Sequence, residues 1–215
     1  RSSGLKILMI EKGSDIERRA CPMIESDIPC VQCSLCSILC GWGGAGAYSD
    51  GKLTLTSAFG GWLGEYVPER DLDGLIAYVD GIYRHYGAGQ EVHGENAAAV
   101  ERLRRKARGY DLQLVPARIR HIGTDLCRDV LKNIRDDLDG KVSLLFNTPA
   151  SQIAVENGAV SGVLTADGKR YEAPVVIIAA GREGSSWLSG EAKRLGLALQ
   201  TNPVDIGVRV ELPAA

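Results

Sequence analysis

The chain has 215 residues, 45% of them hydrophobic and 24% charged, close to an average globular domain. This length supports a core without disulfide or metal staples, which excludes a small stapled scaffold and makes a globally disordered chain a poor interpretation. Lysine and arginine number 25 against 27 acidic residues, and a net charge of -2 gives no bulk field for a polyanion. The apolar runs Leu5–Ile10 and Val175–Ala180 are much shorter than the roughly 20 residues of a membrane span. We therefore expect neither nucleic acid nor a membrane as a partner.

The two ends of the sequence predict an incomplete chain. It begins at Arg1, without a signal-peptide pattern before the first apolar run, and it ends just after the strand-like run Gly207–Glu211. We expect material to be missing at both ends. We also expect a cytoplasmic protein, because its six cysteines would be prone to oxidation outside the cell.

The first predicted element is a strand at Leu5–Ile10, apolar on both faces and followed at once by Glu11. Such a run is typical of a central strand in a parallel sheet. Residues 14–51 follow as a loop rich in cysteine and glycine, and Lys52–Thr56 alternates like a short strand.

Helical spacing of apolar residues dominates residues 71–138. Helices are predicted over Asp71–Tyr86, Asn96–Arg108 and Thr124–Leu138, with a strand-like run at Leu112–Val115 between the second and the third. Cys127 lies on the apolar face of the last helix, where we expect a packed thiol.

Residues 142–181 predict an antiparallel meander and then a returning parallel strand. Strand signals occur at Val142–Phe146, Ser151–Val155, Ala159–Thr165 and Arg170–Glu172. Asn-Gly and Asp-Gly pairs, which are strong hairpin signals, separate the last three. Val175–Ala180 is again fully apolar and ends at Gly181, which predicts a second buried parallel strand.

This order of elements predicts an α/β fold: a Rossmann-like, dinucleotide-binding domain with an inserted meander. In such a domain Glu11, at the end of a parallel strand, accepts hydrogen bonds from the adenosine ribose. The plainer alternative is that Glu11 only solvates a strand end. The glycine fingerprint that should precede this strand is not in the sequence.

Five stretches resemble one known family. They are LKILMIEKG at Leu5–Gly13, CGWGGAGAYSDGKL at Cys40–Leu53, HIGTD at His121–Asp125, VVIIAAGREGSSW at Val175–Trp187 and PVDIGVRVE at Pro203–Glu211. Together they are similar to the NAD(P)/FAD-dependent oxidoreductases of the glutathione-reductase-like flavoprotein superfamily, in the subgroup of uncharacterised FAD-dependent dehydrogenases. The resemblance implies a partial FAD-binding domain over residues 1–215, with NAD(P)H as a candidate electron donor.

The resemblance also implies which residues contact FAD. Glu11 would hold the ribose, and glycines of the Gly41–Gly51 segment would let the backbone approach the cofactor. The implied cofactor-binding residues are Glu11, Gly43, Gly44, Gly46, Ser49, Asp50, Lys52, Ala180 and Gly181. The alternative for the glycines is a tight turn without a ligand.

Four cysteines form a C-x2-C-x2-C-x3-C run: Cys30, Cys33, Cys36 and Cys40. This is the spacing of a bacterial-type [4Fe–4S] ligand run, although Gly41 replaces the proline that usually follows. Cys21 is an alternative fourth ligand. A redox-active dithiol beside the flavin, a zinc site and ordinary core packing are the other interpretations, and a disulfide framework is disfavoured.

His121 precedes a predicted helix N-terminus, where an anion or a substrate carbonyl can bind, and it is the one catalytic candidate. The sequence thus predicts an FAD-dependent oxidoreductase that exchanges electrons with a small-molecule substrate or an electron-transfer partner, with an iron–sulfur cluster as a relay. Two alternatives are open: a flavin disulfide reductase that uses a cysteine pair, and a non-catalytic zinc-binding α/β module.

Overall fold

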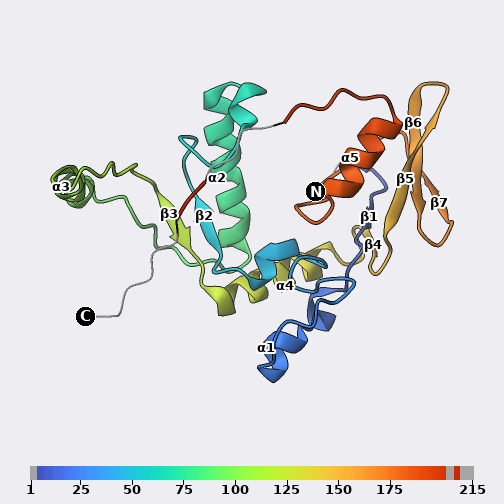
Figure 1. The fold of residues 1–215 in the computed structure, drawn as a ribbon, viewed down its shortest axis with the longest axis horizontal. Helices are drawn as coiled ribbons and strands as arrows, with labels where there is room; N and C mark the ends of the chain where they lie inside the picture. The colour runs from blue at the N-terminus through green and yellow to red at the C-terminus, as the bar shows by residue number, and fades with distance from the viewer. Residues whose placement is uncertain (1–3, 202–205, 209–215) are drawn as a thin grey trace.

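The structure is a computed structural model that describes residues 4–201 and 206–208. Along its longest dimension, a three-stranded meander lies at one end and the helix α3 (Ala97–Arg108) at the other (Figure 1). Between them lie the helices α2 (Glu69–His85) and α4 (Thr124–Leu138). The chain is therefore a mixed α/β protein, as predicted.

A short parallel pair joins the two halves of the sequence. The strand β1 (Leu8–Ile10) runs parallel to β4 (Ser143–Leu145), with Leu8 opposite Ser143 and Ile10 opposite Leu145. The parallel direction predicted for the first strand is confirmed. Its burial is not, because Leu8 and Met9 are 38% and 40% exposed. The pair has only two strands among the described residues, so much of its surface stays uncovered.

The predicted parallel strand at Val175–Ala180 does not form, and that prediction is wrong for this structure. Val175 and Ile177 are 73% and 88% exposed, and the segment pairs with no strand in the described part of the chain. An extended segment becomes a strand only when a neighbour takes up its backbone hydrogen bonds. A Rossmann-like sheet is therefore not confirmed, and of the strand-like run Gly207–Glu211 residues 209–211 lie outside the described residues.

The predicted meander is confirmed for three strands. They are β5 (Ala150–Glu156), β6 (Ala159–Thr165) and β7 (Arg170–Glu172), paired antiparallel in that order. Asn157 and Gly158 both have positive φ angles, 51° and 78°, as a two-residue hairpin turn requires. The first of the four predicted strands, Val142–Phe146, forms as β4, which pairs with β1 and not with the meander.

The helix α5 (Ser185–Arg194) covers the outer edge of β5. Glu191 accepts a hydrogen bond from the backbone N–H of Ile153 at 2.8 Å, and Arg194 donates to the carbonyl of Ile153 at 2.7 Å. Two side chains thus replace the hydrogen bonds of a further strand, which protects an otherwise open sheet edge.

The predicted helices form with nearly the predicted bounds. Asn96 caps α3 by accepting a hydrogen bond from the N–H of Ala99 at 2.9 Å, and α4 begins and ends where predicted. The remaining elements are α1 (Pro22–Ser26), the 3-10 helices at Ile16–Arg18, Gly44–Tyr48 and Leu63–Glu65, and the antiparallel strands β2 (Lys52–Thr54) and β3 (Ile119–His121). No helix in the described ranges is both long and apolar enough to cross a bilayer.

The strand-like run at Leu112–Val115 is a loop, contrary to prediction. Leu112 is 63% exposed and no described strand pairs with the run, so its backbone has no ladder partner. The strand instead forms at β3, which pairs with β2.

The core surrounds α4. Its buried members are Ile16, Trp42, Ala47, Ala88, Ile122, Cys127, Val130 and Leu131. The indole N–H of Trp42 donates to the carbonyl of Leu131 at 2.8 Å, which fixes the glycine-rich loop on α4. Cys127 is 3% exposed, so its predicted role as a packed thiol is confirmed.

A buried ion pair joins β3 to α2. Arg120 is 3% exposed, and its Nε and Nη2 lie 2.6 and 2.8 Å from the two carboxylate oxygens of Asp80. Its Nη1 also donates to the carbonyl of Gly89 at 2.6 Å. Hydrogen bonding to Arg120, aided by the charges of Arg120 and Arg84, holds the pKa of the Asp80 carboxyl below its ordinary value.

We predict that Asp80→Asn lowers the free energy of unfolding by about 3 kcal/mol near neutral pH, because it leaves a buried guanidinium without its counter-charge. Glu95→Gln, which breaks the exposed ion pair with Arg118, is the control and should cost at most about 1 kcal/mol. The pKa of Asp80 is lower folded than unfolded, so its stabilisation is present above the unfolded pKa and is lost as pH falls through the folded value. Urea unfolding at several pH values should show a flatter acid limb for Asp80→Asn, and equal losses for the two variants would contradict the prediction.

Candidate functional site

A buried arginine determines the path of the cysteine- and glycine-rich loop. Arg19 is 3% exposed, and its guanidinium donates hydrogen bonds of 2.6–3.0 Å to four backbone carbonyls, those of Ser37, Ile38, Trp42 and Gly44. Backbone carbonyls thus accept all of these hydrogen bonds from a buried charge. The planar guanidinium of arginine suits this arrangement because it carries five N–H donors that point in fixed directions.

The ring of Tyr48 completes the surroundings of Arg19. The guanidinium carbon lies 5.0 Å from the ring centroid, and the Tyr48 hydroxyl donates to the carbonyl of Arg19 at 3.1 Å. Residues 37–48 are therefore wrapped around one side chain.

Glu11 lies at the carboxyl end of the parallel strand β1, as predicted. Its Oε1 accepts hydrogen bonds from the backbone N–H groups of Gly13 and Gly41, at 2.8 and 2.9 Å. Gly41 has a φ of +109°, and a Cβ on it would lie 2.6 Å from the carbonyl oxygen of Ser14. Only glycine permits this approach, so one carboxylate oxygen joins the strand end to the loop.

A second contact brings the turn after Ala180 to the same strand end. Lys12 lies 2.9 Å from the carboxylate of Glu183, and the N–H of Gly184 donates to the carbonyl of Ala180 at 3.1 Å. Ala180 and Gly181 are therefore close in sequence to a residue that contacts the end of β1, although both are exposed.

Cys40 is enclosed beside Lys12 and Glu183. It is 4% exposed, and burial raises the pKa of its thiol, an effect that the ammonium of Lys12 opposes. The thiol form is therefore favoured in this fold. Metal ligation would require the loss of this proton, which burial disfavours.

The predicted cofactor glycines have two different environments. A Cβ on Gly43 would lie 2.7 Å from a methyl carbon of Leu131, so its glycine is explained by packing on α4. At Gly44 and Gly46 no atom lies within 4 Å of the Cβ position. Both glycines therefore have open space beside them that a ligand could enter.

Ser49, Asp50, Lys52 and His121 lie together at the start of β2 and the end of β3. Asp50 is 2.7 Å from the Lys52 ammonium and 4.0 Å from Nε2 of His121, and Lys52 pairs with His121 in the ladder. The Ser49 hydroxyl donates to the carbonyl of Gly46 at 2.9 Å. Hydrogen bonding to Lys52 lowers the pKa of Asp50. The structure thus brings these four predicted residues to one exposed surface; a catalytic role for His121 stays a prediction.

The six cysteines are all free and do not gather around one centre. Cys30 and Cys33 are exposed, whereas Cys21 and Cys36 are half-buried. Within residues 4–201 and 206–208, no three or more cysteine, histidine, aspartate or glutamate side chains are placed to hold a metal ion. This arrangement does not fit a [4Fe–4S] cluster or a zinc ion, so ligation by Cys30, Cys33, Cys36 and Cys40 stays a prediction.

The residues that assemble this region were not found from the sequence. Arg19 binds backbone carbonyls, which no residue type marks in a sequence, and Lys12 and Glu183 are 171 residues apart. A signal was available only for Lys12, which directly follows Glu11 at the end of the strand.

Comparison with known proteins adds one relative. No protein-family model matches the chain. A protein of Clostridium beijerinckii, recorded as "Uncharacterized protein", is 27% identical over 214 residues, which make up 98% of this chain and 32% of the relative. The chain therefore spans about a third of the length of this relative. The recorded name states no activity.

We predict that iodoacetamide modifies Cys30 and Cys33 rapidly and Cys40 and Cys127 slowly, because the first two are exposed and the last two buried. Arg19→Lys should raise the rate at Cys40 about tenfold or more, since lysine cannot bridge the carbonyls that Arg19 holds, and should leave Cys127 protected. Arg18→Lys, at the exposed neighbouring position, is the control. Peptide mass spectrometry over time measures each rate, and an unchanged Cys40 in Arg19→Lys would show that Arg19 does not hold the loop.

Proposed function

We propose that this chain is part of an FAD-dependent oxidoreductase and that FAD lies at the carboxyl end of β1. One observation carries the proposal: Glu11 directly follows a strand in a parallel pair, and its carboxylate is joined to the first glycine of the Gly41–Gly51 segment. Parallel sheets bind nucleotides at this end of their strands. The similarity of five stretches to flavoprotein dehydrogenases supports the same assignment.

The residues at this strand end fit such a cofactor in part. Oε1 of Glu11 already accepts two backbone N–H groups, so a ribose would have to use Oε2. Gly44 and Gly46 have open space beside them, whereas Gly43 is packed on α4. Residues of this chain that would hold FAD are therefore Glu11, Gly44, Gly46, Ser49, Asp50, Lys52, Ala180 and Gly181.

Bound flavin would supply the electron chemistry by accepting a hydride, with NAD(P)H or a small-molecule substrate as candidate donor. The part of this chain is binding and orientation. Glu11 would orient the ribose, and the backbone of the Gly41–Gly46 segment would approach the cofactor where a Cβ is absent. Arg19 would act only as a positioning residue, because it contacts the loop and keeps its path fixed.

We predict that Glu11→Gln, in the protein encoded by the whole gene, weakens FAD retention about tenfold to hundredfold, the range for a hydrogen bond to a charged group. Glutamine keeps an oxygen that can accept from Gly13 and Gly41 but removes the charge and the second acceptor. Glu17→Gln, which changes an exposed carboxylate paired with Lys132, is the matched control.

Flavin absorption after dialysis, with thermal melts of both variants, measures the effect. Loss of flavin with an unchanged melting temperature supports the ribose contact. Equal flavin content in the two variants and the parent would return Glu11 to the plainer interpretation of a residue that only shapes a strand end.

We also propose that Cys30, Cys33, Cys36 and Cys40 ligate a [4Fe–4S] cluster, with Cys21 as an alternative fourth ligand. Support comes from the spacing of these cysteines and from the exposure of Cys30 and Cys33, which no burial holds in place. Cys30, Cys33 and Cys36 precede the residues that Arg19 holds, so they would have to move toward Cys40 to bring four sulfurs together, and we derive no electron path through such a centre.

Cys33→Ser should remove the iron and sulfide from anaerobically purified protein, with Cys127→Ser as the control, because Cys127 is buried in the core. Flavin without iron in the parent protein would contradict the cluster and favour a disulfide reductase with a cysteine pair. Zinc without flavin would favour the non-catalytic α/β module and contradict the oxidoreductase as well.

A further inference from the structure

The helix α3 concentrates positive charge in a chain whose net charge is -2. Its 12 residues, AAAVERLRRKAR, carry five basic side chains and one acidic one. The helix lies at one end of the molecule and is joined to the rest by extended segments (Figure 1). None of its side chains is buried, so its basic groups face solvent and are open to ligands.

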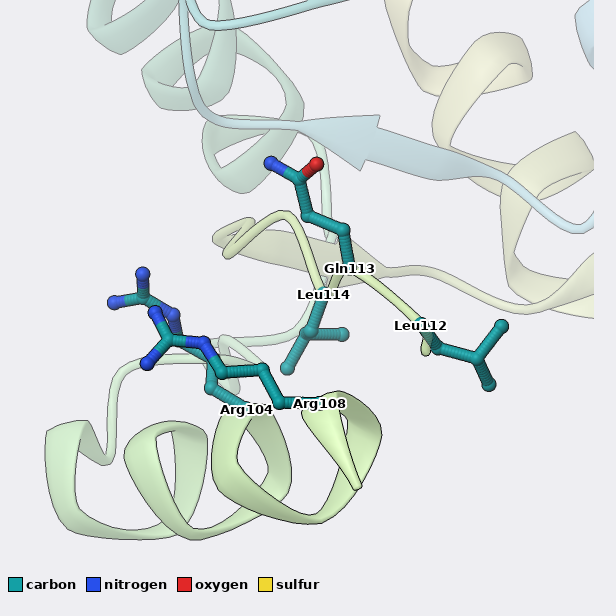
Figure 2. A pocket seen from close by; sticks show the side chains of 5 residues that line it. All are labelled: Arg104, Arg108, Leu112, Gln113 and Leu114. Atoms are coloured by element: carbon teal, nitrogen blue, oxygen red, sulfur yellow. The ribbon is translucent and has the colours of Figure 1, made fainter. Parts of the chain in front are cut away.

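A cavity of about 280 Å³ opens between α3 and the loop that follows it. Its lining residues are Arg104, Arg108, Leu112, Gln113 and Leu114. Arg104 and Arg108 are four residues apart on one helix, so their side chains project from the same face. Figure 2 shows the two guanidinium groups together on one side of the cavity, with the Leu114 side chain directed toward the helix that carries them and those of Leu112 and Gln113 directed away.

The charge of this arginine pair is only partly balanced. Arg104 lies 3.5 Å from Glu101, which also lies 3.3 Å from Arg105. Among the described residues no carboxylate forms an ion pair with Arg108. Two adjacent guanidinium groups repel each other, and an anion between them relieves that repulsion while accepting hydrogen bonds in the forked geometry of arginine.

The other side of the cavity is apolar. Leu114 is 37% exposed, so its side chain offers a ligand apolar surface that the protein itself leaves uncovered. The volume lies just below the roughly 300 Å³ at which pockets for drug-sized ligands begin. A phosphate with one small ring or a short chain suits this size.

We propose that the cavity between α3 and residues 112–114 binds a small organic phosphate, whose phosphoryl group lies between Arg104 and Arg108 and whose apolar part contacts Leu114. This site is separate from the proposed FAD site at the end of β1, and it uses none of the residues named there. Either proposal can therefore fail without the other.

Phenyl phosphate is the probe, titrated into the 215-residue chain at low salt and followed by NMR of the arginine side-chain N–H groups. We expect phenyl phosphate to bind about fivefold more tightly than inorganic phosphate, because the ring covers leucine surface. Arg108→Gln should weaken binding about tenfold. Arg102→Gln, which removes the same charge from the same helix outside the cavity, should change it by less than about twofold.

Three results would overturn the proposal. Equal weakening by Arg108→Gln and Arg102→Gln would mean that the whole helix attracts anions without a site. Equal affinity for phenyl phosphate and inorganic phosphate would remove the apolar contact. Tighter binding of a short DNA duplex at equal phosphate concentration, lost steeply with added salt, would identify a polyanion surface instead. Circular dichroism of each variant confirms that the helix is retained.

Discussion

The candidate site depends on one buried cation, Arg19. Placing a guanidinium away from water is costly unless its donors are satisfied, and here backbone carbonyls between Ser37 and Gly44 satisfy them. The same hydrogen bonds also satisfy carbonyls of residues 37–44, which have no strand partner that could pair with them. The side chain and the loop therefore stabilise each other, and this mutual dependence places Cys40 and Gly41 against the end of β1.

That placement gives Glu11 a structural role before any ligand is considered. Its Oε1 closes the junction between the strand end and Gly41, and glycine is needed there because a Cβ would overlap the backbone of Ser14. A strand-end carboxylate can thus carry two tasks with its two oxygens. This is why an alanine at position 11 would confuse loss of the junction with loss of a ribose contact, while glutamine separates them.

Local patterns predicted elements well where local interactions determine them. The bounds of Ala159–Thr165 and Thr124–Leu138 match the structure, because hairpin turns and an apolar helix face are encoded within a few residues. Val175–Ala180 failed because a strand needs a neighbour, which its own sequence cannot specify. Of the site, Asp50, Lys52 and His121 were each singled out from the sequence but were not placed together, whereas the Arg19 interactions left no periodic or spacing signal.

The net charge, like a local sequence pattern, does not show which side chains lie together in the fold. A value of -2 averages over the whole chain and describes only the bulk field that a distant polyanion would meet. Salt limits the range of the electric field of an exposed charge to about 10 Å at ordinary ionic strength. A ligand at α3 is therefore attracted by the side chains beside it and is hardly affected by the acidic residues elsewhere. Five basic residues on one short helix can therefore attract a small anion, as proposed, although the net charge of the chain is -2. Affinity there should depend on which arginines line the cavity and only weakly on the total charge.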